Sequence, residues 1–123
     1  MDSDPQRRAL GLETMAKVYG WPEVGDAPGD FFGYTTEHLF AEIWNREGLS
    51  NRDRRLVLIG LLVGRGLHDV VALQLEAALS NGELDGHLLR EIVILLTHYA
   101  GWPDGAKLNS AVEALLAKHG ESN

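Results

Sequence analysis

The sequence predicts an all-α fold, and two observations carry that prediction. Apolar residues recur at the three- and four-residue spacing of amphipathic helices, and no stretch reads convincingly as a β-strand. Breaks containing glycine or proline divide the chain into about six such segments. Because 123 residues of ordinary globular composition have the length of one domain, we expect a single domain over residues 1–123.

The first third of the chain is predicted to hold two helices joined by a loop. The first helix runs from about Pro5 to Tyr19, with proline at its first position, where the missing N–H costs little. Residues 20–33 contain four glycines and two prolines, and three aromatic side chains that we expect to pack this loop against a core. Thr35 and Thr36 are expected to cap the second helix, which ends near Asn45.

The middle of the chain holds two unusually apolar helices. No residue from Leu56 to Val63 is polar, so the first has no solvent face and must be buried in a core or a subunit contact. The second, at about 69–81, places the amides of Gln74 and Asn81 among apolar residues, where they need hydrogen-bond partners. Gln74 then either orients a ligand or is a core glutamine bonded to backbone. The remaining helices are predicted at about residues 86–99 and, after Asp104, up to about Lys118.

Charge and residue usage exclude several classes of function. The net charge of −7 and pI near 5.1 argue against nucleic acid and against anionic membranes as partners, which leaves a small molecule. The chain has no cysteine, so disulfides, thiolate metal sites and thiol nucleophiles are excluded. We find neither a signal peptide nor an apolar run approaching ~18 residues, and we expect a cytoplasmic protein.

Motifs for metals and cofactors are missing, and two single residues stand out instead. Two histidines and a glutamate share a polar stripe on the helix at 86–99, but without a metal-ligand spacing, so we predict no metal and no cofactor. His68, at a helix start, is either an acid or base near neutral pH or an exposed end residue. Arg52 lies at the mouth of an apolar helix face, where it either binds a carboxylate bidentately or pairs with an acidic residue.

Three segments, AEIWNREGLSNRDRR, LEAALSNGEL and LREIVILLTHYAGWP, resemble the carboxymuconolactone decarboxylase family, which shares a superfamily with the AhpD-like alkylhydroperoxidases. The resemblance covers about residues 37–118 and includes Trp44, Arg52 and Asn81. It implies an AhpD-like helical bundle that assembles into a ring-shaped homo-oligomer, commonly a trimer or hexamer. A ring would also bury the two apolar helices.

Carried over residue by residue, the resemblance shows where this chain departs from its superfamily. Leu67 and Val70 stand where the peroxidases have the cysteines of their CxxC motif, so a thiol peroxidase is excluded. Arg55 stands where those enzymes have a glutamate. Gln74 stands where the decarboxylase branch has a histidine, and glutamine cannot transfer a proton at neutral pH.

The resemblance therefore implies a lyase of the decarboxylase type, acting without a cofactor on a small cyclic carboxylic acid or lactone in aromatic compound catabolism. Arg52 would hold the carboxylate, Gln74 would stabilise negative charge as carbon dioxide leaves, and His68, Tyr34 or water would return a proton. Gln74 and His68 are thus the predicted catalytic residues. The predicted substrate-binding residues are Arg52, Trp44, Asn81 and Tyr34.

Two other interpretations stay open at this point. A non-catalytic oligomeric binding or scaffold protein would explain why both the cysteines and the family histidine are missing. A lyase or isomerase of an aromatic or polyketide-like acid would need Gln74 only as an orienting group.

Overall fold

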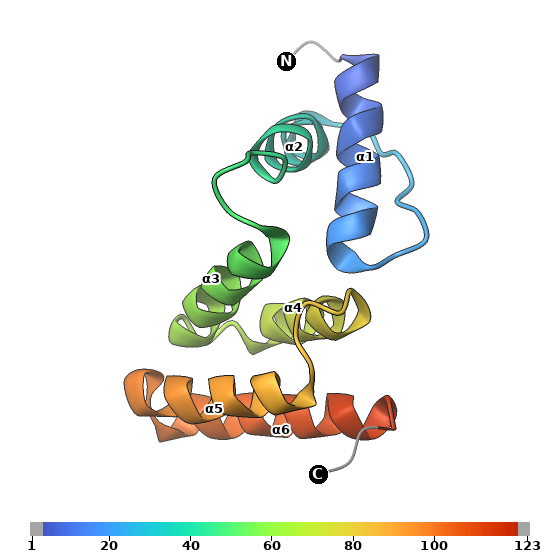
Figure 1. Ribbon diagram of the computed structural model, residues 1–123. Coiled ribbons are helices and arrows are strands. Elements are labelled where there is room, and N and C mark those ends of the chain that lie inside the picture. Colours follow the sequence, from blue (N-terminus) through green and yellow to red (C-terminus); the bar gives the residue numbers. More distant parts are fainter. Residues whose placement is uncertain (1–3, 121–123) are drawn as a thin grey trace. The chain divides into compact units, whose positions relative to one another are not determined.

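The computed structural model describes residues 4–120, and this part of the chain contains helices and no strand, as the sequence predicts (Figure 1). It has two compact units, an N-terminal unit up to Asn51 and a C-terminal unit from Arg52, and the expectation of a single domain stays a prediction. The elements are α1 (Pro5–Tyr19), α2 (Asp30–Tyr34), η1 (Thr35–Ile43), α3 (Asn51–Gly64), α4 (His68–Ser80), α5 (Gly86–Ala100) and α6 (Trp102–Lys118).

In the N-terminal unit α1 packs against η1 at very short range. A Cβ built on Gly11 of α1 would lie 1.8 Å from the carbonyl oxygen of Thr36 in η1, so only glycine permits this approach. Next to this crossing, the buried carboxylate of Glu37 accepts hydrogen bonds from the backbone N–H of Asp4 at 2.8 Å and from Arg8 Nε at 2.9 Å. The start of α1 is thereby tied to η1.

The second predicted helix begins earlier than expected, and Thr35 and Thr36 do not cap it. The helix starts at Asp30 and continues without a break into η1, a π-helical stretch. Thr35 and Thr36 donate their hydroxyl hydrogens to carbonyls one turn back, each at 2.9 Å, and so lie inside the helix. Phe31 is 88% exposed, so the expectation that the loop aromatics pack down was wrong for this residue.

The C-terminal unit has one hydrophobic core to which all four of its helices contribute. The buried core side chains are Ile59 and Val63 of α3, Val71, Leu75 and Ala78 of α4, Leu84 before α5, Leu89 and Val93 of α5, and Leu108, Val112 and Leu116 of α6. The helix pair α5 and α6 is close because Gly105 lies against Thr97. Local signals hold here, since Gly82 has a φ of 69° after α4 and Asp85 caps α5.

Helix α3 is less buried than its apolar sequence suggests. Ile59 and Val63 are inaccessible, but Val57 is 60% exposed and Leu61 is 52% exposed in the single chain. Burial of this face in a subunit contact, and with it a ring-shaped assembly, stays a prediction. None of the helices among residues 4–120 is both long and apolar enough to cross a membrane.

Candidate functional site

A buried arginine forms the centre of the C-terminal unit's polar network. Arg55, on the second turn of α3, has no exposed surface and lies on the same stripe as Ile59 and Val63. Its Nε donates to Oε1 of Glu83 at 2.8 Å, and its Nη2 lies 3.5 Å from Oε2 of the same carboxylate. Glu83 lies in the turn between α4 and α5, and its side chain is only 10% exposed. The ion pair is therefore almost inaccessible to solvent.

Gln74 of α4 also contacts this guanidinium. The residue is 4% exposed, and its Oε1 accepts a hydrogen bond from Arg55 Nη1 at 2.5 Å. Because a guanidinium can only donate, the oxygen of the amide is the atom that faces it. The prediction that this amide is buried and hydrogen-bonded is confirmed, and its partner is a side chain instead of backbone. Arg55 and Gln74, two of the four residues at which the sequence is expected to depart from the pattern it resembles, therefore contact each other.

Arg52, the predicted carboxylate ligand, is attached to the same network from the solvent side. Its Nε donates to the backbone carbonyl of Glu83 at 3.2 Å, and its terminal nitrogens make no hydrogen bond or ion pair within residues 4–120. A groove runs from this exposed guanidinium. Its other lining residues are Leu56, Leu84, Leu88, Glu91, Ile92 and Leu95. Glu83 thus contacts both Arg52 and Arg55, and Arg55 also contacts Gln74.

His68 lies at the other end of α4 and is not an exposed end residue. Its side chain is 18% exposed, and its Nε2 lies 2.8 Å from Oδ1 of Asp104 on α6. Its Nδ1 is buried and has no hydrogen-bond partner among residues 4–120. It lines a hollow together with Leu67, Val70 and Lys107. At 1.5 Å per residue, the 13 residues of α4 place roughly 18 Å of helix between it and the end near which Arg52 is anchored.

The remaining predicted residues are Asn81, Tyr34 and Trp44. Asn81 is exposed at the C-terminal end of α4, so the expectation that both amides face apolar surroundings was wrong for it. Tyr34 and Trp44 belong to the N-terminal unit, where Tyr34 is 57% exposed and Trp44 is buried with its ring stacked 6.2 Å from that of Phe40. Their roles in substrate binding stay predictions.

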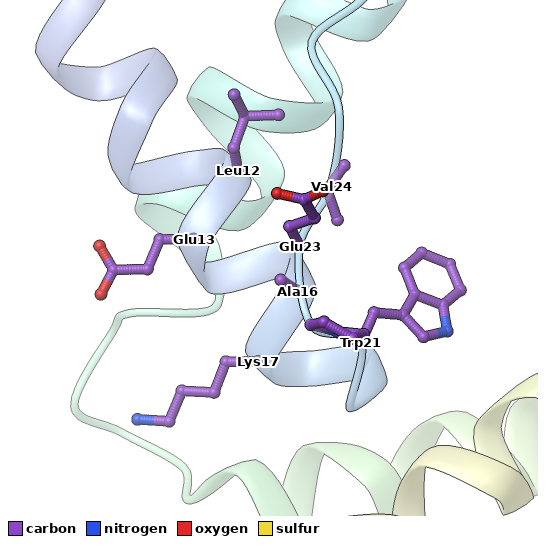
Figure 2. Close-up of a pocket in the computed structure, with 8 residues that line it drawn as sticks. Leu12, Glu13, Ala16, Lys17, Trp21, Glu23 and Val24 are labelled. Carbon is purple, nitrogen blue, oxygen red and sulfur yellow. The ribbon is translucent and has the colours of Figure 1, made fainter.

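The N-terminal unit has a hollow of its own, between α1 and the loop that follows it. Figure 2 shows its lining side chains, among them Glu13 and Lys17 of α1 and Trp21 and Glu23 of the loop. It holds none of the predicted site residues, and its charged groups are two acids and one lysine. We give this hollow no part in the site. Among residues 4–120, no three histidine or acidic side chains cluster as a metal site would require.

Glu83 is the residue that sequence reasoning missed, although a signal for it existed. Arg55 precedes Ile59 and Val63 by four and eight residues, so helical spacing alone places it on the buried face of α3. A buried arginine requires a carboxylate partner. The sequence has eighteen acidic residues, and nothing in it says which of them folds back onto α3.

Comparison with known proteins supports the family resemblance of the chain. The profile of the carboxymuconolactone decarboxylase family matches residues 29–117. The chain is 32% identical over 108 residues to the 4-carboxymuconolactone decarboxylase of Acinetobacter baylyi, covering 82% of this chain and 80% of that protein. It is 31% identical over 115 residues to nitrosuccinic acid decarboxylase npaB of Metarhizium robertsii, covering 86% and 74%. No solved structure matches the chain.

Proposed function

We propose that this chain, which belongs to the carboxymuconolactone decarboxylase family, removes carbon dioxide from a small carboxylic acid. Both relatives are decarboxylases and are named for carboxylic acids, one of them a lactone and the other carrying a nitro group. A lactone carbonyl or a nitro group can take up the electron pair that decarboxylation leaves on carbon. The proposed substrate is therefore a carboxylic acid with such an electron-withdrawing group next to the carbon from which the carboxylate leaves.

The geometry of Arg52 is the observation that carries this proposal. Its Nε is anchored to the Glu83 carbonyl, which leaves the two terminal nitrogens to bind both oxygens of a carboxylate. The leucine and isoleucine side chains of the groove, such as Leu88 and Ile92, suit the apolar body of such an acid. Glu91 lines the same groove and would repel a carboxylate, so the second carboxylate of a dicarboxylic substrate should point away from it.

The reaction needs one proton for each carbon dioxide released. The carbon–carboxylate bond breaks, its electron pair moves into the electron-withdrawing group, and a proton then adds to the carbon. We assign that proton to water, because the Arg52 groove is open to solvent and His68 lies at the far end of α4 in the same chain. Catalytic roles for Gln74 and His68 stay predictions from sequence.

A second candidate is a non-catalytic binding protein of the same fold. The contact between Arg55 and Gln74 favours it, because two of the positions to which the resemblance gives chemistry here belong to a buried hydrogen-bond network. Such a protein would still bind a carboxylate at Arg52 but would release no carbon dioxide. An isomerase would give a third result, a product of unchanged mass.

These candidates are separated by incubating the purified protein with 4-carboxymuconolactone and with nitrosuccinic acid, and following carbon dioxide and products by NMR. We expect at least one acid to be decarboxylated. The Arg52→Met variant should lower kcat/KM by roughly 10- to 100-fold, mainly through KM, because a charge-assisted hydrogen bond to the bound carboxylate is lost. Arg65→Met removes an exposed arginine of the same unit and is the matched control.

The outcomes differ clearly between the candidates. Saturable binding of an acid without carbon dioxide release would favour the binding protein, and an isomeric product would favour the isomerase. If neither acid binds or reacts, or if Arg52→Met behaves like Arg65→Met, the proposed function is wrong.

A further inference from the structure

Glu83 contacts two arginines with two different groups, and only one of these arginines can reach a substrate. Its carboxylate holds the buried Arg55, and its backbone carbonyl holds the exposed Arg52. We propose that Gln74, Arg55 and Glu83 are positioning residues, which fix the carbonyl that anchors Arg52. This inference rests on the proposed function, in which Arg52 binds the substrate carboxylate.

The anchoring carbonyl is fixed from both sides along the chain. Before it, Gly82 turns the chain with a φ of 69°, and the N–H of Glu83 donates to the carbonyl of Ala78 at 3.0 Å. After it, Leu84 is 2% exposed and lines the groove. The carboxylate of Glu83 adds the third restraint by its ion pair with Arg55, so the peptide cannot rotate without breaking a buried contact.

The buried ion pair makes this restraint stiff. Arg55 has no access to water, so each acceptor it loses leaves an unpaired donor in the interior. Glu83 and Gln74 supply three acceptor oxygens, from a turn and from a helix respectively. A guanidinium held in this way fixes the position of Glu83 relative to α3, the helix that also carries Arg52.

The same contact disfavours a positively charged proton donor at position 74. Arg55 requires an acceptor there, and an imidazolium beside a buried guanidinium would place two positive charges in contact. Glutamine offers an acceptor oxygen without a charge. Position 74 therefore supports the substrate arginine, and it does not carry the proton.

A double-mutant cycle between Glu83→Gln and Arg52→Met tests the proposal on the full chain, with the acid that reacts in the decarboxylation assay. Glu83→Gln alone should raise KM roughly threefold or more and leave kcat nearly unchanged. In the Arg52→Met background the same change should have no further effect on KM, because its influence passes through Arg52. Glu113→Gln removes an ion pair with Arg90 elsewhere in the unit and should leave KM unchanged.

Gln74 variants give a second and milder test of the same link. Gln74→Met should raise KM as Glu83→Gln does. Gln74→Glu should have a KM close to that of the wild type, because glutamate keeps an acceptor for Arg55. A merely structural role would lower the thermal unfolding temperature of these variants without changing KM at temperatures where the protein is folded.

A readout independent of activity separates this inference from the proposed function. The Nε–H signal of Arg52 in a ¹⁵N NMR spectrum, assigned by its loss in Arg52→Met, should be shifted and protected in the wild type. It should move toward the position of a free arginine in Glu83→Gln. If the signal does not change, or if the two mutations act additively on KM, the inference is wrong even where decarboxylation is confirmed. If the wild type decarboxylates no acid, the proposed function fails, and this signal still decides the positioning.

Discussion

Both units of the chain bury an arginine–glutamate pair, but the buried partner differs. In the N-terminal unit the carboxylate of Glu37 is inside, at 1% exposure, and Arg8 reaches outward to Asp26 at 2.6 Å. In the C-terminal unit the guanidinium of Arg55 is inside, and Glu83 approaches it from a turn.

The difference follows from hydrogen-bonding capacity. A buried carboxylate is satisfied by nearby donors, and Glu37 finds one in the backbone N–H of Asp4 at the start of α1. A guanidinium carries five N–H donors and must collect acceptors from several elements, so Arg55 binds both Gln74 and Glu83. The first pair holds a helix end, and the second connects two helices and a turn to the groove.

The largest expected effect is the loss of the buried guanidinium. Arg55→Met leaves Glu83 nearly buried without its counter-charge and Gln74 without its donor, which should lower the free energy of unfolding by about 3–5 kcal/mol. Arg8→Met should cost less, because Glu37 keeps the Asp4 N–H. Urea unfolding of the two variants measures both values. Equal losses would mean that the direction of burial does not matter.

The close helix contacts allow an intermediate test of the same comparison. Gly11→Ala would place Cβ 1.8 Å from a backbone oxygen, whereas Gly105→Ala would place it 2.3 Å from the Thr97 hydroxyl, a side-chain atom. Backbone cannot move aside without separating the helices, so Gly11→Ala should exceed the roughly 1–3 kcal/mol usual for overpacking, and Gly105→Ala should fall within it. Alanine is otherwise better than glycine in a helix by about 0.5–1 kcal/mol, so a stabilised variant would contradict the geometry.

The smallest expected effect is on the free energy of unfolding at acidic pH. The hydrogen bond from the Asp4 N–H, aided by Arg8, holds the pKa of Glu37 below its ordinary value of 4.5. A carboxyl whose pKa is lowered by folding contributes stability above its unfolded pKa, and that contribution is lost as pH falls through its folded pKa. Wild-type protein should therefore lose unfolding free energy more steeply below about pH 4.5 than Glu37→Gln.

Glu113 is the matched control for the acid experiment. Its hydrogen bond with Arg90 also lowers the pKa, but its side chain is 43% exposed, so Glu113→Gln should flatten the pH dependence less than Glu37→Gln does. The measurement is a series of urea unfolding curves from pH 6 to pH 3. If Glu113→Gln has the larger effect, Glu37 is not the stronger acid-sensitive contact.

The sequence by itself determined that the chain is helical and where several of its helices begin or end. Asp85 caps the start of α5 and Gly82 ends α4 as predicted, because a cap and a left-handed glycine depend only on the adjacent turn of the chain. The segments around Trp44, Asn81 and Tyr99 also sufficed to indicate the family, which the comparisons confirm. The apolar stripes predicted which faces are buried, although Asn81 proved exposed.

Only the tertiary structure decided which polar groups meet. Arg55 is 19 residues from Gln74 and 28 from Glu83, and no helical period relates such distances. Thr35 and Thr36 show the same limit locally, because a hydroxyl can cap a helix or bond back within one, and the extension of the helix to Asp30 decided between them. A buried guanidinium can be recognised from its stripe on α3, but its acceptors depend on which elements pack around it. Here that packing links Gln74 through Arg55 and Glu83 to Arg52 of the groove.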